Sequence, residues 1–194
     1  MRTVFFDVDT QLDFMLPAGA LYVPGAEGIV PAVARLNRWA AGHSIPVVSD
    51  TDAHAENDPE FSRWPPHCVA GTAGQRKIAE TLLERRVTLP ARLADYSIQG
   101  AQQIILEKTT LDCFDNPNLP GLLDRLDAGR AVVYGVVTEY CVRLAALGLL
   151  RVGMNVELVT DAVMALADED AARTLDEIQR AGGRLTTVER VCAD

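Results

Sequence analysis

The stretch Ala131–Val142, AVVYGVVTEYCV, decides how the rest of the chain is interpreted. It begins with a continuous apolar run, which is typical of a strand buried on both faces of a parallel sheet. A short polar turn follows, and Cys141 then begins a helical segment, CVRLAALGLL. We therefore expect a thiol where a strand ends and a helix begins, beside backbone N–H groups without helical partners. Such a position favours a thiolate and can also bind an oxyanion.

Short apolar runs recur along the chain and alternate with segments of helical periodicity. The runs predict strands at 3–8, 45–49, 103–107 and 155–159, and the periodic segments predict helices at 29–40, 72–85 and 168–181. This alternation is typical of a parallel sheet that is covered by helices on both faces. We expect a single α/β domain over residues 1–194, with three α/β/α layers and a mostly parallel, roughly six-stranded Rossmann-like sheet.

Four polar residues come just after predicted strands, namely Asp9, Asp52, Lys108 and Cys141. The carboxyl ends of parallel strands meet at one edge of the sheet, where open α/β folds bind their ligands. An aspartate there can accept a thiol proton, and a lysine stabilises both anions. Each residue alone has an ordinary alternative: a buried core cysteine, a turn aspartate or a solvated lysine. Only their joint placement favours a catalytic set.

The connection from 52 to 76 is long and has no clear periodicity, and such loops are usually functional. It contains two of the three histidines of the chain, His54 and His67, together with the carboxylates of Asp52 and Glu60. Mixed carboxylate and imidazole ligands suit Zn²⁺, Mn²⁺ or Fe²⁺. Exposed polar side chains are the alternative interpretation of this pattern.

Two aromatic residues, Phe14 and Trp64, lie near these groups in the sequence. A pair of aromatic side chains beside a site can enclose a flat ring. Ordinary packing explains them equally well, so the sequence leaves both interpretations open.

Composition excludes several classes of partner. The net charge of −9 argues against nucleic acid or an anionic membrane surface as the main partner. No apolar segment approaches the length needed to span a bilayer.

The acidic residues in MRTVFFDVDTQLDF favour a strand over a signal peptide. The four cysteines have no CxxC spacing, which favours free thiols in a reducing cytoplasm.

These motifs resemble those of the isochorismatase-like cysteine hydrolases, and within that family the nicotinamidase/pyrazinamidase branch. The chain has D-x-Q-x-D-F at 9–14, D-x-H at 52–54, W-P-P-H-C-V-x-G-T at 64–72, E-K-T at 107–109, G-x-x-T-[DE]-x-C-V at 135–142 and T-D-A at 160–162. The resemblance covers nearly the whole chain, with the motifs in the same order.

The resemblance implies a catalytic triad of Cys141, Asp9 and Lys108. It further implies an oxyanion hole formed by the backbone N–H groups of Val137 and Cys141. A cis peptide bond between Val136 and Val137 is part of the same expectation.

The resemblance also implies one divalent metal ion, with zinc as the first candidate and manganese or iron as alternatives. The implied ligands are Asp52, His54, Glu60 and His67. The ring nitrogen of nicotinamide would coordinate this metal, while Phe14 and Trp64 flank the ring.

The implied activity is the hydrolysis of nicotinamide to nicotinate and ammonia through a thioester, as in NAD salvage, with pyrazinamide as a further substrate. The segment after Lys108, residues 109–115, lacks the pattern of many nicotinamidases. A ureido or maleamic acid, or an isochorismate-type substrate, therefore stays as the alternative. A binding or scaffold protein without activity is disfavoured by the complete triad. The partners expected are a small amide substrate and, by family likeness, further copies of the chain.

Overall fold

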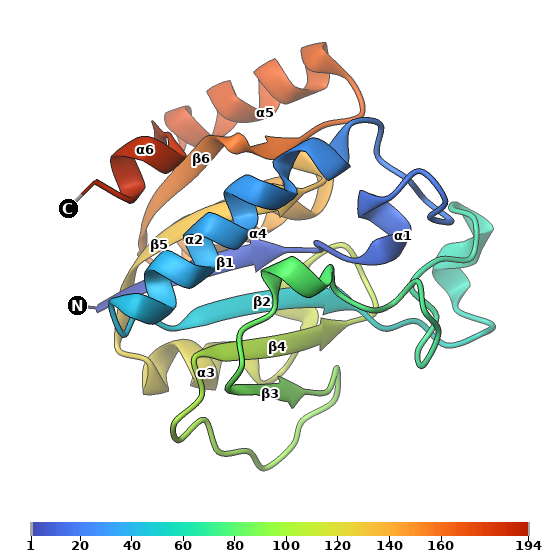
Figure 1. The fold of residues 1–194 in the computed structure, drawn as a ribbon, viewed down its shortest axis with the longest axis horizontal. Helices are drawn as coiled ribbons and strands as arrows, with labels where there is room; N and C mark the ends of the chain where they lie inside the picture. The colour runs from blue at the N-terminus through green and yellow to red at the C-terminus, as the bar shows by residue number, and fades with distance from the viewer. Residues whose placement is uncertain (1, 194) are drawn as a thin grey trace.

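The central feature of the computed structural model, which describes residues 2–193, is a parallel sheet. Within these residues seven strands form one sheet in the order β3-β4-β2-β1-β5-β6-β7, and all neighbours are parallel (Figure 1). The strands are β1 (Arg2–Val8), β2 (Val47–Asp52), β3 (Arg86–Leu89), β4 (Gln103–Lys108), β5 (Ala128–Val136), β6 (Asn155–Met164) and β7 (Arg184–Thr186). The predicted α/β fold is confirmed, with seven strands where roughly six were expected.

Helices cover both faces of this sheet. They are α1 (Leu12–Met15), α2 (Val30–Gly42), α3 (Leu119–Arg125), α4 (Arg143–Arg151), α5 (Asp168–Arg180) and α6 (Val188–Val191). Helix α2 lies on one face and α3 and α4 lie on the other (Figure 1). Among residues 2–193, no helix has the length and hydropathy that a membrane span requires.

Strand β1 shows how the sequence divides between the two cores. Val4, Phe6 and Val8 pack in the core with α3 and α4, whereas Phe5 packs in the core with α2. Successive side chains of a strand point to opposite faces, so a run that is apolar at every position requires cover on both sides. The apolar run at the start of the chain is therefore a central strand, with β2 and β5 as its neighbours.

The strand register brings the expected site residues to one edge of the sheet. Val8, at the end of β1, pairs with Asp50 of β2 and with Gly135 of β5. Asp52, the last residue of β2, pairs with Lys108, the last residue of β4. The carboxyl ends of the four central strands are therefore level with one another.

The helix predicted at 72–85 does not form, and only Ala79–Thr81 adopts a short 3₁₀ turn. Lys77 instead forms an antiparallel bridge with Gln11, and the Ile78 N–H donates to the Thr10 carbonyl over 2.9 Å. Ile78 does reach the core with α2, as its apolar character required. The periodicity is misleading because Ile78 and Leu83 reach this core from a segment that is not helical apart from the short 3₁₀ turn.

Gly135 allows β1 and β5 to approach each other closely just before the candidate nucleophile turn. Its φ is 120°, a left-handed value that side chains disfavour, and a Cβ built there would lie 2.1 Å from the Val8 carbonyl oxygen. No rotamer change relieves such a clash, because the backbone fixes the position of a Cβ and the Val8 carbonyl is itself backbone.

We therefore expect Gly135→Ala to lower the free energy of unfolding by about 2 kcal/mol or more, since it adds backbone strain and overpacking. Denaturant unfolding followed by circular dichroism measures this change. Gly42→Ala, at the end of α2, is the matched control, because a Cβ there meets no atom within 4 Å. Equal stability of the two variants would show that the fold does not require the close contact between β1 and β5 at Gly135.

Candidate active site

Cys141 lies in a turn between β5 and α4, as the sequence predicted. The residue is only 4% exposed, and it sits in a π-helical turn, Thr138–Val142, before α4 begins at Arg143. The peptide bond between Val136 and Val137 is cis, which confirms that prediction.

Two hydrogen bonds to the Val137 carbonyl close this turn. They run from Tyr140 N–H and Val142 N–H to the Val137 carbonyl, over 3.0 Å and 3.2 Å. The N–H groups of Val137 and Cys141, which are the expected oxyanion donors, take no part in these two bonds.

Lys108 brings the other expected residues together. Its ammonium group is fully buried and donates to Asp9 Oδ2 over 2.9 Å and to Asp52 Oδ1. The same nitrogen lies 3.8 Å from Cys141 Sγ. One cation therefore contacts all three of the other residues that the sequence placed at strand ends.

Burial and charge set different protonation states for these groups. Burial alone would lower the pKa of Lys108, but Asp52 and Asp9 raise it well above its usual value, so the lysine stays charged. Burial alone would raise the pKa of Asp52, but Lys108 holds it below its usual range, so this carboxylate stays ionised. Burial, and then the charge of Asp52, raise the pKa of Asp9 to about 6 against the opposing charge of Lys108. Asp9 can therefore exchange a proton near neutral pH, as a general base must.

Asp9 also has a free acceptor atom that faces this chemistry. Its Oδ2 binds Lys108, whereas Oδ1 is buried and has no hydrogen-bond partner within residues 2–193. The Cys141 thiol lies close enough for hydrogen bonding to lower the pKa of the Asp9 carboxyl. The Asp9 carboxylate is therefore close enough to the thiol to accept its proton.

The structure corrects the expectation that this turn favours a thiolate. Burial raises the pKa of the Cys141 thiol well above its usual value. The charge of Lys108 lowers this pKa, but by less than burial raises it, and the charge of Asp9 raises it further. The thiol is protonated at rest. Nucleophilic attack by this sulfur therefore requires proton transfer to a base during the reaction.

Asp52, His54 and His67 form a buried cluster whose ligand atoms all lie within 4.8 Å of one another. The Nε2 atoms of His54 and His67 lie 3.5 Å and 3.6 Å from Asp52 Oδ2. No backbone group and no uncharged side chain binds either ring nitrogen of His54 in the described part of the chain. His67 Nδ1 lies 2.8 Å from the Pro65 carbonyl, which leaves Nε2 directed at Asp52. Buried imidazole nitrogens beside a carboxylate fit a divalent cation such as zinc.

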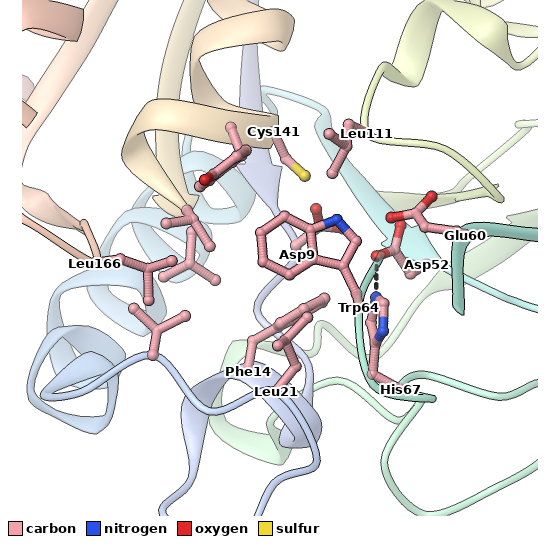
Figure 2. A pocket seen from close by; sticks show the side chains of 14 residues that line it. Asp9, Phe14, Leu21, Asp52, Glu60, Trp64, His67, Leu111, Cys141 and Leu166 are labelled. Carbon is pink, nitrogen blue, oxygen red and sulfur yellow. Dashed lines mark ion pairs between the residues drawn. The ribbon is translucent and has the colours of Figure 1, made fainter. Parts of the chain in front are cut away.

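Glu60, the fourth expected ligand, lies outside this cluster. It belongs to the 3₁₀ turn Pro59–Ser62 and lines the cavity near Asp52 (Figure 2). Asp58, which the sequence did not single out, has Oδ2 3.1 Å from His54 Nδ1 and caps the same turn by accepting the Glu60 N–H. In metal sites a carboxylate is the usual outer partner of a ligand histidine, so Asp58 is a candidate for that role beside His54.

Two residues of the first motif position the loop that carries these side chains. Gln11 Nε2 donates to the Asp52 carbonyl over 2.8 Å, and Gln11 Oε1 accepts the Asp52 N–H over 2.7 Å. Asp13 Oδ2 accepts the Cys68 N–H, next to His67, over 2.7 Å. Sequence reasoning assigns no individual role to Gln11 or Asp13, although both belong to the D-x-Q-x-D-F motif at 9–14.

A cavity with an empty volume of about 460 Å³ joins the thiol to the cluster. In Figure 2, Cys141 and Asp52 face the same space, and Phe14 and Trp64 also border it. The lining consists of Asp9, Phe14, Leu21, Val23, Asp52, Glu60, Trp64, His67, Leu111, Val136, Val137, Tyr140, Cys141 and Leu166. It is largely apolar, and these described lining residues include no arginine or lysine.

The segment after Lys108 contributes an apolar wall. Leu111 borders the cavity, whereas the carboxylates that follow it hold local turns. Asp112 accepts the Phe114 N–H over 2.9 Å, and Asp115 accepts the Thr110 hydroxyl over 2.7 Å. Leu111, like Leu21 and Leu166, could not be assigned to the site from sequence because isolated leucines carry no positional signal.

Comparison with known proteins agrees with this geometry. The isochorismatase domain family matches residues 3–190. The nicotinamidase of Escherichia coli (strain K12) is 27% identical, over 93% of this chain and 92% of that protein. The pyrazinamidase of Pyrococcus horikoshii in complex with zinc has a TM-score of 0.82 and 29% identity, over 96% of this chain and 99% of that one.

A further solved structure shows how widely the fold is shared. The N-carbamoylsarcosine amidase of Thermoplasma acidophilum has a TM-score of 0.80 and 24% identity, over 97% of this chain and 98% of that one. Because the family match spans nearly all of the described residues, including the nucleophile turn and the cluster, the chain belongs to the isochorismatase family of hydrolases.

Proposed function

We propose that this chain is a nicotinamidase, a metal-dependent cysteine amidohydrolase that converts nicotinamide and water to nicotinate and ammonia. Pyrazinamide is a second expected substrate. The observation that carries the proposal is a buried thiol, with a carboxylate acceptor, that opens into the same cavity as an Asp-His-His cluster. The similarity to the Escherichia coli nicotinamidase and to the zinc-bound Pyrococcus horikoshii pyrazinamidase supports it.

The cavity suits a small flat ring with a carboxamide on one side. The Cys141 thiol and the Asp-His-His cluster lie at different parts of one cavity. A substrate therefore needs one group that reacts with the thiol and another that binds at the cluster. A pyridine or pyrazine carboxamide has an amide carbon for Cys141 and a ring nitrogen for a cation at Asp52. Phe14 and Trp64 add the aromatic contacts that favour a flat ring.

The same lining disfavours the alternative substrates. Ureido acids, maleamic acid and isochorismate-type compounds carry carboxylates, which proteins usually bind with arginine or lysine. Neither residue type lines the cavity within the described chain, and Lys108 is held by Asp9 and Asp52. Glu60 adds further negative charge near the cluster. A neutral amide therefore fits this cavity better than an anionic one.

The first half of the reaction forms a thioester. Asp9 Oδ1 accepts the thiol proton while Cys141 Sγ attacks the amide carbon, and the N–H groups of Val137 and Cys141 stabilise the resulting oxyanion. Lys108 stays protonated and balances the negative charge that passes between sulfur and carboxylate. The C–N bond then breaks, and Asp9 returns the proton to the leaving nitrogen, which departs as ammonia.

The second half hydrolyses the thioester with the same groups. Asp9 accepts a proton from a water molecule, and the water oxygen attacks the thioester carbon. The oxyanion forms again near Val137 and Cys141. The C–S bond breaks, and the thiolate regains its proton from Asp9, so the enzyme is restored and the acid product leaves.

Asp52, His54 and His67 would hold the divalent cation, with Glu60 beside them. When bound, this ion supplies a Lewis acid that orients and polarises the ring. The protein residues alone carry the proton transfers, because Asp9 and Cys141 lie together at the thiol side of the cavity.

We expect the zinc-loaded protein to release ammonia from nicotinamide and pyrazinamide, and not from maleamate or N-carbamoyl amino acids. Cys141→Ala should lower kcat by at least about 10⁴-fold because it removes the nucleophile. Cys192→Ala, at a cysteine outside the cavity, should retain activity. Preferred turnover of a carboxylate-bearing amide, or turnover by the Cys141 variant, would exclude the proposed reaction.

We also expect kcat/KM to fall as the pH drops through the pKa of Asp9, because only the ionised carboxylate accepts the thiol proton. Burial and the charge of Asp52 raise this pKa to about 6. A cation bound at Asp52 would offset the negative charge of Asp52 and so weaken its effect on the pKa of Asp9. The midpoint of the acid limb should therefore lie at about 6 or below. A pH–rate profile at constant metal content measures it, and a rate that rises on acidification would remove Asp9 as the base.

Elemental analysis should find one divalent metal ion per chain, and added zinc should raise the melting temperature because it binds the folded state. His54→Ala and His67→Ala should lose both effects, since each removes a buried ligand. His43→Ala is the matched control, because His43 follows α2 and lies outside the cluster. Full metal content in the His54 and His67 variants would place the metal elsewhere.

A further inference from the structure

A second buried lysine–aspartate pair lies at the carboxyl end of β1. The side chains of Asp7 and Lys77 are 0% and 2% exposed, and Lys77 Nζ donates to Asp7 Oδ2 over 2.9 Å. Burying two charges is costly unless hydrogen bonds satisfy both. The reaction described above uses neither residue, so the pair needs another explanation.

The pair is part of a hydrogen-bond network on the α2 side of the sheet. Asp7 accepts from Asn37 Nδ2 of α2 over 2.9 Å and from Ser49 Oγ of β2 over 3.2 Å. Thr10 connects the network to the turn after β1. Its hydroxyl donates to Asp7 Oδ1 over 2.8 Å and accepts from Lys77 Nζ over 2.5 Å.

Asp9 stands next to this connection and has an unusual backbone conformation. Its φ is 49°, in the left-handed region that residues other than glycine rarely adopt. Regular alternation would direct residue 9 to the α2 side, like Phe5 and Asp7. Its carboxylate instead contacts Lys108, which follows Ile104 and Leu106 on the opposite face.

The chain therefore turns over between these two residues, with Asp9 directed to one face of the sheet and Thr10 to the other. Backbone bonds support this turn from both sides. The Asp9 N–H donates to the Asp50 carbonyl over 3.1 Å, and the Ile78 N–H donates to the Thr10 carbonyl over 2.9 Å. The hydroxyl of Thr10 is the side-chain group that fixes the turn to the charged pair.

We propose that Thr10, held by Asp7 and Lys77, is a positioning residue that keeps Asp9 in the conformation from which its carboxylate reaches Cys141. The buried pair thus serves the reaction through the backbone of the base, without touching the substrate. The inference rests on the proposed function only in taking Asp9 as the base for Cys141.

The direct test compares Thr10→Val with Thr10→Ser in the zinc-loaded protein. Valine keeps the shape but removes the hydroxyl that binds Asp7 and Lys77, whereas serine retains it. We expect Thr10→Val to lower kcat for nicotinamide by about 10- to 100-fold, because small displacements of a catalytic group have effects of this size. KM should stay unchanged because Thr10 does not line the cavity. Thr10→Ser should have kcat near the wild-type value.

Ser49→Ala is the matched control, because it removes another buried hydroxyl that binds Asp7 without a bond to Thr10. It should lower the melting temperature and leave kcat unchanged. Wild-type kcat in Thr10→Val, or an equal loss of kcat in Ser49→Ala, would overturn the proposal. If Thr10→Val does not fold, Lys77→Met carries the same prediction, and wild-type kcat in that variant would overturn it.

A second readout separates this proposal from the proposed substrate. Alkylation of Cys141 by iodoacetamide needs the base but no amide substrate. We expect Thr10→Val to slow alkylation by a factor similar to its loss in kcat, and Thr10→Ser to restore the rate. If the wild-type protein fails to hydrolyse nicotinamide, the substrate assignment is wrong, and the alkylation rates still decide whether Thr10 positions Asp9.

Discussion

The ammonium group of Lys108 is the interaction on which the site depends. It is fully buried at the end of β4, and it contacts Asp9 and Asp52 while lying 3.8 Å from the Cys141 sulfur. Without this cation, two carboxylates would be buried side by side, which is strongly unfavourable. Lys108 therefore permits two carboxylates to occupy one sheet edge, with Asp9 beside the thiol and Asp52 in the Asp-His-His cluster.

The same burial explains why the site needs a base and how the base is prepared. Removal from water keeps the Cys141 thiol protonated, and it also raises the pKa of Asp9 into the range where a carboxylate can accept and return a proton. Both shifts come from one low-dielectric environment. The surrounding chain holds this arrangement in place: Gln11 binds the backbone of Asp52, and the turn at Asp9 and Thr10 is fixed by polar contacts on the opposite face of the sheet.

The sequence predicted what depends on strand ends and motifs, and it failed where distant contacts decide. Parallel strands with polar residues at their carboxyl ends placed Asp9, Asp52, Lys108 and Cys141 together, and the structure has this arrangement. The predicted helix at 72–85 was wrong because Lys77 pairs with Asp7 and Gln11, far away in the chain, instead of with its neighbours. The protonation state of the Cys141 thiol could not be predicted from the sequence either, because it depends on burial and on the charges of Lys108, Asp9 and Asp52.

The most direct test of the account is mass spectrometry of protein quenched in acid during turnover of nicotinamide. The account predicts a nicotinoyl group bound to the peptide that contains Cys141, since the amide carbon is transferred to that sulfur before water attacks. The adduct should disappear when the substrate is exhausted. Steady turnover of nicotinamide with the acyl group on a residue other than Cys141 would contradict the central claim that this buried site acts by acyl transfer to Cys141.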